Sequence, residues 1–161
     1  MGESAYELLS ISVANEAETA QLAQGLAALL AVGDVVLLEG TLGAGKTAFC
    51  RALIRAVLNE PDAIVASPTF TFSQIYAGEK LTITHFDLYR MGEPEEVYDL
   101  GWDDALIDGA TLVEWPDRLG ALRPVDGLRV LIEPDADLET GRHFRLVGPQ
   151  GWAKRLEPMT A

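Results

Sequence analysis

Residues 34–47 read DVVLLEGTLGAGKT, and the predicted fold depends most on this segment. Its first six residues form a short, nearly unbroken apolar run, which is typical of a strand buried on both faces of a sheet. The next eight, Gly40 to Thr47, match the pattern GxxxxGK[ST] in full, and a helix is predicted to begin at Lys46. The segment therefore predicts a buried strand, a phosphate-binding loop and a helix, in that order.

The chemistry of this loop follows from its residue types. Glycines let the backbone curl so that successive amides converge on phosphate oxygens, while Lys46 reaches the β and γ phosphates and the hydroxyl of Thr47 binds magnesium. The start of the helix adds the positive end of its dipole. At Ala48, where many such loops have a second hydroxyl, only the backbone amide is available. The loop residues expected to bind nucleotide are Leu42, Gly43, Ala44, Gly45, Lys46, Thr47 and Ala48.

Apolar strands and helical patterns alternate outward from this segment. The expected strands are residues 6–13, 34–39, 69–76, 81–89, 110–113, 128–133 and 143–147. The expected helices lie between a cap at Asn15 and a stop at Gly33, from Lys46 to about Leu58, and at 93–108, 116–122 and 152–156. The strands at 69–76 and 81–89 are predicted to form a hairpin. This order predicts an α/β, three-layer P-loop NTPase fold with a mainly parallel sheet plus an antiparallel hairpin.

Length and composition limit the function further. The 161 residues are 48% apolar and 23% charged, which suits one domain over 1–161, with about ten C-terminal residues expected as a peripheral tail. With 12 basic and 25 acidic residues the net charge is −13, which argues against autonomous nucleic-acid binding and favours a basic protein partner. The single cysteine, Cys50, and a longest apolar run of seven residues predict a cytoplasmic protein without membrane contact.

Two apolar strands end in a carboxylate, at Asp87 and at Glu114. Each is expected at the carboxyl edge of the sheet beside the phosphate loop, where ligands bind in open α/β sheets. Hydrolysis needs a carboxylate that orders the metal and a group that positions the nucleophile. Asp87, Glu114 and Lys46 are therefore the candidate catalytic residues. The alternatives are a surface role for Glu114 and an ion pair with Arg90 for Asp87.

Other residues near these carboxylates have more than one interpretation. His85 shares a strand face with Asp87, although a structural role is more common for such a histidine than a role as base. Trp115 stacks on a nucleotide base or a partner, or else is buried in the core. Cys50 falls among apolar helix residues, which indicates an inert core thiol.

Two segments are candidates for regulation. Ser67 and Thr69 flank a proline, which suits either a switch loop that senses the γ phosphate or a simple capped turn. Residues 93–104 carry six acidic side chains and no basic one. They form either a solvated helix face or a docking surface for a basic partner.

Four segments stand in a fixed order, GTLGAGKT at 40–47, SPTFTF at 67–72, HFDLYR at 85–90 and LVEWP at 112–116. Together they resemble the TsaE family, once called YjeE, which are small bacterial P-loop ATPases needed for threonylcarbamoyladenosine formation on tRNA. The resemblance covers about residues 6–147. It departs from the family at Phe70, where a tyrosine is usual, and at Ala48, where a threonine is frequent.

The resemblance implies that the protein binds ATP and Mg²⁺ and hydrolyses ATP slowly. It also implies association with TsaD and TsaB, the pair that transfers threonylcarbamoyl to tRNA, in a role that resets or regulates the pair. By match of motif, Lys46 and Thr47 hold phosphate and magnesium, Glu114 is the second magnesium residue, and Asp87 is needed for hydrolysis. The same match implicates Trp115 in the site.

A phosphate loop also occurs in other classes of protein. A small-molecule kinase needs a lid with several arginines, and Arg118, Arg123 and Arg129 are dispersed along the chain. A GTPase normally reads guanine through an NKxD sequence, which neither Asn15 nor Asn59 begins. A nucleotide-gated binding module, in which hydrolysis is incidental, stays open as an alternative.

Overall fold

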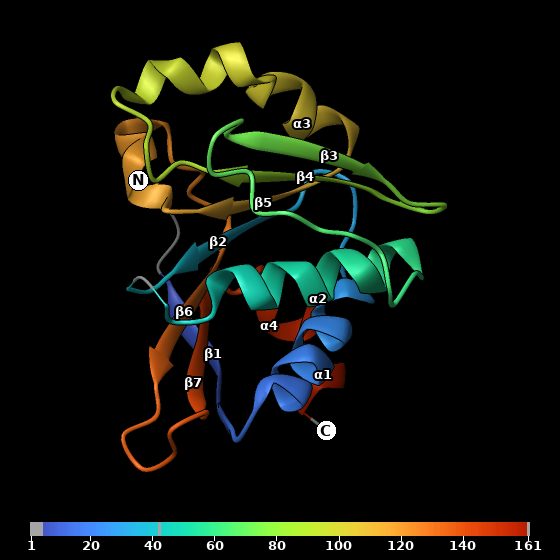
Figure 1. The fold of residues 1–161 in the computed structure, drawn as a ribbon, viewed down its shortest axis with the longest axis vertical. Helices are drawn as coiled ribbons and strands as arrows, with labels where there is room; N and C mark the ends of the chain where they lie inside the picture. The colour runs from blue at the N-terminus through green and yellow to red at the C-terminus, as the bar shows by residue number, and fades with distance from the viewer. Residues whose placement is uncertain (1–4, 42, 161) are drawn as a thin grey trace.

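The computed structural model describes residues 5–41 and 43–160, so Leu42, one of the expected nucleotide-binding residues, lies outside the described part. Seven strands form one sheet in the order β1-β7-β6-β2-β5-β4-β3 (Figure 1). They are β1 (Tyr6–Val13), β2 (Val35–Glu39), β3 (Ser73–Ala77), β4 (Thr82–Asp87), β5 (Ala110–Glu114), β6 (Leu128–Pro134) and β7 (Arg142–Gly148). The α-helices are α1 (Glu16–Ala27), α2 (Lys46–Leu58), α3 (Trp102–Asp108), α4 (Gly151–Arg155) and α5 (Glu157–Thr160), and the 3₁₀ helices are η1 (Pro94–Leu100) and η2 (Pro116–Leu122).

The sheet is mixed, which corrects the expectation of a mainly parallel one. The four central strands β6, β2, β5 and β4 are mutually parallel. The pairs β3–β4, β6–β7 and β1–β7 are antiparallel. A short connection after β6 forces β7 to return beside it, because only antiparallel neighbours are joined by a hairpin. The expected hairpin of β3 and β4 is confirmed, and a second antiparallel group lies at the opposite edge.

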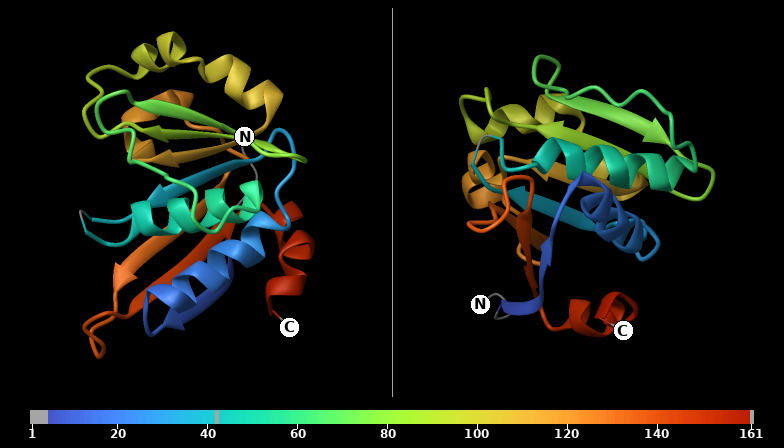
Figure 2. Two further views of the ribbon diagram at one scale, coloured as in Figure 1. Left: turned by 45° about the vertical axis from the view of Figure 1, so that its right-hand side comes forward. Right: turned by 60° about the horizontal axis from the view of Figure 1, so that its bottom comes forward.

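Helices cover both faces of this sheet and give three layers (Figure 2). Strand β2 shows why, because its alternate residues enter different cores. Val36 and Leu38 pack in one apolar cluster with residues of α1 and α2. Val35 and Leu37 pack in a second cluster with residues of η1 and α3. The prediction of a strand buried on both faces is confirmed, while the P-loop class of the fold stays a prediction.

Several element boundaries differ from the expectation. Helix α1 ends at Ala27, and the amide of Ala31 donates to the Asp34 carboxylate at 2.8 Å in the turn beyond it. Strand β3 begins only at Ser73, because the amide of Phe72 donates to the Pro68 carbonyl at 2.7 Å and closes a turn over 69–72. The acidic stretch is two helices rather than one.

The C-terminal segment is more firmly packed than a peripheral tail. Trp152 and Leu156 are buried in the same cluster as α1 and α2, and the Trp152 indole donates to the Asp126 carbonyl at 3.1 Å. The expectation of a peripheral tail is therefore wrong for these two residues. None of the described helices is long and apolar enough to cross a membrane.

Candidate functional site

Three parallel strands bring the predicted site residues to one edge of the sheet. In the register of β4 and β5, Asp87 lies opposite Glu114, and in that of β2 and β5, Leu38 lies opposite Glu114. The loop that follows β2 therefore begins beside both carboxylates. A pocket of about 380 Å³ opens there, lined by Gly43, Gly45, Lys46, Thr47, Ala48, Ser67, Thr69, Asp87, Tyr89, Arg90, Glu114 and Trp115.

Lys46 lies in this pocket with its side chain folded back over the loop. Its Nζ donates to the carbonyls of Gly40 at 2.5 Å and Thr41 at 2.9 Å. It also lies 4.1 Å from the centroid of the Trp115 ring, within cation–π distance. Burial lowers the pKa of Lys46, while the negative charges of Glu114 and Asp87 oppose that shift. The ammonium is thus held beside the carboxylates without forming an ion pair to them within the described residues.

The loop backbone is held from two directions. Gly45 has a φ of +107°, a left-handed conformation that glycine tolerates best, and α2 begins at the next residue. On the other side, Arg142 of β7 donates through Nε to the Ala44 carbonyl at 3.0 Å. Sequence reasoning missed Arg142, because it lies 98 residues after Ala44 and belongs to no recognised motif.

Glu114 is buried, and both of its carboxylate oxygens are hydrogen-bonded. The hydroxyl of Thr47 donates to Oε1 at 3.0 Å, and Nε2 of His85 lies 2.7 Å from Oε2. The structure therefore joins the two predicted metal residues, Thr47 and Glu114, directly. It rules out the alternative of a surface glutamate at the strand end, because Glu114 is only 2% exposed.

Asp87 fixes the segment that sequence analysis marked as a switch. Its Oδ1 accepts from the Tyr89 amide at 3.1 Å, and its Oδ2 accepts from the Ser67 hydroxyl at 3.4 Å. Ser67 in turn lies 3.0 Å from the Thr69 hydroxyl. Asp87 thus links the end of β4 to the loop at 67–69, and both parts line the pocket.

The alternative pairing of Asp87 with Arg90 does not occur among the described residues. The Arg90 guanidinium instead lies 4.7 Å from the centroid of the Phe70 ring. Arg90, which lines the pocket, therefore forms a cation–π pair with Phe70, which does not. Phe70 itself is largely exposed.

Trp115 follows β5 in a left-handed conformation, with φ 60° and ψ 53°. This conformation costs a bulky residue about 1–3 kcal/mol, and it persists where the surroundings fix it. Pro116 follows directly, and the Tyr89 ring packs against the indole with its centroid 4.9 Å away and its plane tilted by 46°. The strained backbone turns the indole over Lys46 and into the pocket wall, so Trp115 is not a core residue.

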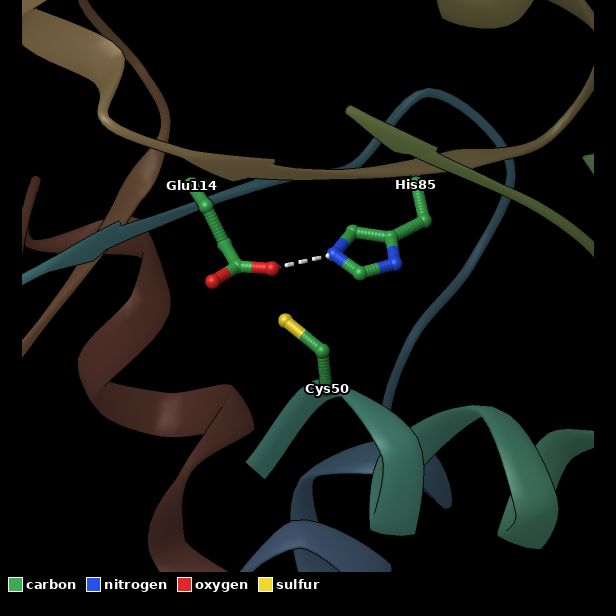
Figure 3. Close-up of side chains that lie close together, drawn as sticks. All are labelled: Cys50, His85 and Glu114. Carbon is green, nitrogen blue, oxygen red and sulfur yellow. Dashed lines mark hydrogen bonds and ion pairs between the residues drawn. The ribbon is translucent and has the colours of Figure 1, made fainter. Parts of the chain in front are cut away.

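Cys50 and His85 meet Glu114 beneath the pocket, which sequence reasoning did not foresee (Figure 3). Cys50 is fully buried, as expected of a core thiol, and burial raises its pKa well above the usual value. Its neighbours are polar, however, because its sulfur faces His85 and Glu114. Helix periodicity could have shown this, since Cys50 lies one turn after Thr47 on the same face.

The acidic stretch lies away from the pocket. Helices η1 and α3 cover the face of the sheet opposite α2 (Figure 1). All six acidic side chains counted in the sequence are exposed there, namely Glu93, Glu95, Glu96, Asp99, Asp103 and Asp104. Both interpretations, a solvated face and a docking surface, remain compatible with this position.

Comparison with known proteins gives consistent matches. The family model "Threonylcarbamoyl adenosine biosynthesis protein TsaE" matches residues 13–144. A protein of Rickettsia felis named "tRNA threonylcarbamoyladenosine biosynthesis protein TsaE" is 48% identical over 103 residues, which is 64% of this chain and 60% of the relative. The match to a Rickettsia conorii protein of the same name spans 58% of that relative, so the chain covers less than two thirds of these two proteins.

Two matches extend further along both chains. A Bacillus subtilis protein with the same name is 38% identical over 135 residues, 83% of each chain. The solved structure described as "Crystal structure of Bacillus subtilus YdiB" superposes with a TM-score of 0.76 at 27% identity, covering 99% of this chain and 97% of that one. On the match of the family model and of these relatives, the chain belongs to the TsaE family.

Proposed function

We propose that this protein binds ATP with Mg²⁺, hydrolyses it slowly, and takes part in forming threonylcarbamoyladenosine in tRNA. The observation that carries the proposal is the single pocket that collects Lys46, Thr47, Asp87, Glu114 and Trp115 at the carboxyl edge of the sheet. These are the residue types that phosphate binding, metal ordering and hydrolysis require. The names of its relatives support the pathway.

The donor set fits a magnesium ion. Thr47 Oγ1 and Glu114 Oε1 lie 3.0 Å apart, and Mg²⁺ prefers such hard oxygen ligands together with water and substrate phosphates. Thr47 and Glu114 would hold the ion. When bound, Mg²⁺ neutralises charge on the phosphate oxygens. His85 orients Glu114 by holding Oε2, which leaves Oε1 directed at Thr47.

The chain's own groups divide the remaining work. Lys46 Nζ exchanges the carbonyls of Gly40 and Thr41 for the β and γ phosphates, and the loop amides through Ala48 bind the other phosphate oxygens. We assign Asp87 to hydrolysis, because it is the second carboxylate that lines the pocket. Among the described contacts it bonds to Ser67 and to the Tyr89 amide, and not to Thr47 or Glu114. It positions or deprotonates the attacking water.

The position of the pocket arginine supports the proposal that turnover is slow. Fast phosphoryl transfer needs a cation on the transferring phosphate in the transition state. Arg90 lines the pocket, but its guanidinium stacks on the exposed Phe70 ring. A partner that covers Phe70 would change this stacking and free Arg90 for the nucleotide.

We further propose that TsaB and TsaD are the partners and that nucleotide controls the contact. The hydroxyls of Ser67 and Thr69 line the pocket, where they sense the γ phosphate. The exposed acidic side chains of η1 and α3 offer a docking face for a basic surface, with attraction that salt weakens.

The test is the affinity for a TsaB–TsaD pair with an ATP analogue, with ADP and without nucleotide, at low and high salt. We expect the tightest binding with the ATP analogue at low salt, because a nucleotide drives docking only if it binds the docked state better. Equal affinity in the three nucleotide states would refute the switch. Insensitivity to salt would remove the acidic face from the interface.

Two alternatives make different predictions for phosphate release from ATP. A nucleotide-gated module gives slow release that TsaB and TsaD change, whereas a free-standing small-molecule kinase releases no phosphate to water and ignores these proteins. The arrangement of arginines favours the former. Arg123 and Arg129 both pair with Glu39, at 3.0 and 2.7 Å, so they do not form a lid over the pocket.

A further inference from the structure

Three buried side chains of different chemistry converge directly beneath the nucleotide pocket. The sulfur of Cys50, a ring nitrogen of His85 and a carboxylate oxygen of Glu114 lie within 4.8 Å of one another. They come from α2, β4 and β5, and Figure 3 shows the sulfur pointing toward the gap between the imidazole and the carboxylate. The exposed fraction is 0% for Cys50 and His85 and 2% for Glu114.

This combination of donors suits zinc rather than magnesium. Thiolate, imidazole and carboxylate are the three kinds of group that bind Zn²⁺ in proteins, whereas Mg²⁺ takes oxygen ligands. In a tetrahedral zinc site, bond lengths of about 2.0–2.3 Å put neighbouring ligand atoms about 3.3–3.6 Å apart. Nε2 and Oε2 are 2.7 Å apart, and no two of the three ligand atoms are more than 4.8 Å apart, so the side chains must adjust locally to reach that spacing.

Charge also favours a dication at this position. A thiolate from Cys50 and the carboxylate of Glu114 cancel the two positive charges, and neutral His85 adds none. A buried site with zero net charge avoids most of the desolvation penalty that an unpaired ion pays. Glu114 is the member that also lines the pocket, so the pocket is the entry path.

We propose that Cys50, His85 and Glu114 form a Zn²⁺ site that opens into the nucleotide pocket. Glu114 would be shared with the magnesium position beside Thr47, so Zn²⁺ and Mg²⁺ compete for one carboxylate. Zinc bound in this way inhibits ATP hydrolysis. The competition rests on the function proposed above, whereas the zinc site itself does not.

Binding changes the protonation of two ligands. The Cys50 thiol loses its proton to solvent, and His85 binds through an unprotonated Nε2, which leaves its remaining N–H on Nδ1. Nδ1 is buried and has no hydrogen-bond partner among the described residues, although zinc-bound histidines usually have one. We therefore expect weaker binding than in a closed four-ligand structural site.

The test titrates the purified protein with Co²⁺, a coloured substitute for Zn²⁺, under reducing conditions and without nucleotide. Cys50 is the single cysteine, so any thiolate-to-cobalt charge-transfer absorption reports on it alone. We expect this band in the native protein, its loss on adding one equivalent of Zn²⁺, and its absence in Cys50→Ala. A native protein that stays without the band at saturating Co²⁺ would overturn the site.

Matched variants separate this site from surface binding. The chain has two histidines, and His143, bonded to Ser10 and Ser12 at the edge of the sheet, is the control. His143→Ala should keep the band, and His85→Gln should weaken cobalt binding at least tenfold. Circular dichroism confirms that each variant folds. Equal weakening in both histidine variants would contradict the assignment.

The competition has a separate readout. Zinc should raise the Mg²⁺ concentration for half-maximal ATP hydrolysis in the native protein but not in Cys50→Ala, which keeps Thr47 and Glu114. Equal zinc sensitivity in both would refute the competition. If the native protein shows no hydrolysis at all, the proposed function fails, and the cobalt titration still decides the zinc site.

Discussion

Replacing Glu114 by glutamine removes one negative charge from the centre of the site and almost no volume. The amide of Glu114→Gln can keep its oxygen toward Thr47 and donate its N–H to His85 Nε2, so both contacts at 3.0 and 2.7 Å survive. The fold should therefore be retained. What is lost is the charge on the oxygen assigned to magnesium.

The size of the loss follows from the difference between charged and neutral contacts. A hydrogen bond to a charged group contributes about 1.5–3 kcal/mol and a neutral one about 0.5–1.5. A difference of about 1.4 kcal/mol corresponds to a factor of about ten. Because the direct attraction of the carboxylate for the ion adds to this, tenfold is the smallest increase we expect in the Mg²⁺ concentration for half-maximal hydrolysis.

The assay is phosphate release at saturating ATP over a magnesium titration, with thermal unfolding of each variant alongside. The control is Glu39→Gln, which removes a glutamate at the end of the neighbouring strand, bonded to Arg129 and outside the pocket. It should leave the magnesium dependence unchanged. A half-saturating concentration in Glu114→Gln within twofold of the native value would refute the assignment and move the metal role to Asp87.

Further predictions concern the loop and the paired charges beside it. Lys46→Ala should abolish ATP hydrolysis while circular dichroism stays native, and native turnover in this variant would contradict the phosphate-loop assignment. Arg142→Ala frees the Ala44 carbonyl and should weaken ADP binding about tenfold by calorimetry, the equivalent of one charged hydrogen bond; unchanged ADP affinity would show that the loop needs no such support. Although burial alone raises the pKa of Glu39, hydrogen bonds from Arg129 and Arg123 lower it overall. Its stabilisation is therefore present above an unfolded pKa of about 4.3 and is lost as pH falls through the lower folded value, so the unfolding free energy of Glu39→Gln should fall less steeply in acid than the native value.

The parts of the fold that local sequence determines were predictable. The strand at β2, the helix start at Lys46 and the end of α2 at Asn59 follow from apolar runs, glycines and caps, which act over a few residues. The pairing of β1 with β7 was not, because it joins the two ends of the chain. Alternation at 69–72 resembled a strand, but a turn hydrogen bond to Pro68 prevailed.

The site divides in the same way. Motif spacing predicted Lys46 and Thr47, and carboxylates at strand ends predicted Asp87 and Glu114; the topology brings these four residues to one edge of the sheet. The contact between His85 and Glu114 depends on the register of β4 with β5, which cannot be derived from the sequence alone. Arg142 reaches the loop from β7, which is separated from β2 by β6 in the sheet and lies far from it in the chain, so only the folded structure reveals the contact.

The most direct test of the proposed ATP site is a calorimetric titration of the native protein with ATP, with Mg²⁺ present and with Mg²⁺ removed by a chelator. Binding of one ATP per chain that weakens at least tenfold without Mg²⁺ is the result we predict, because Thr47 and Glu114 then lose the ion that links them to the phosphates. Failure to bind ATP in either condition, or equal affinity in both, would contradict the account.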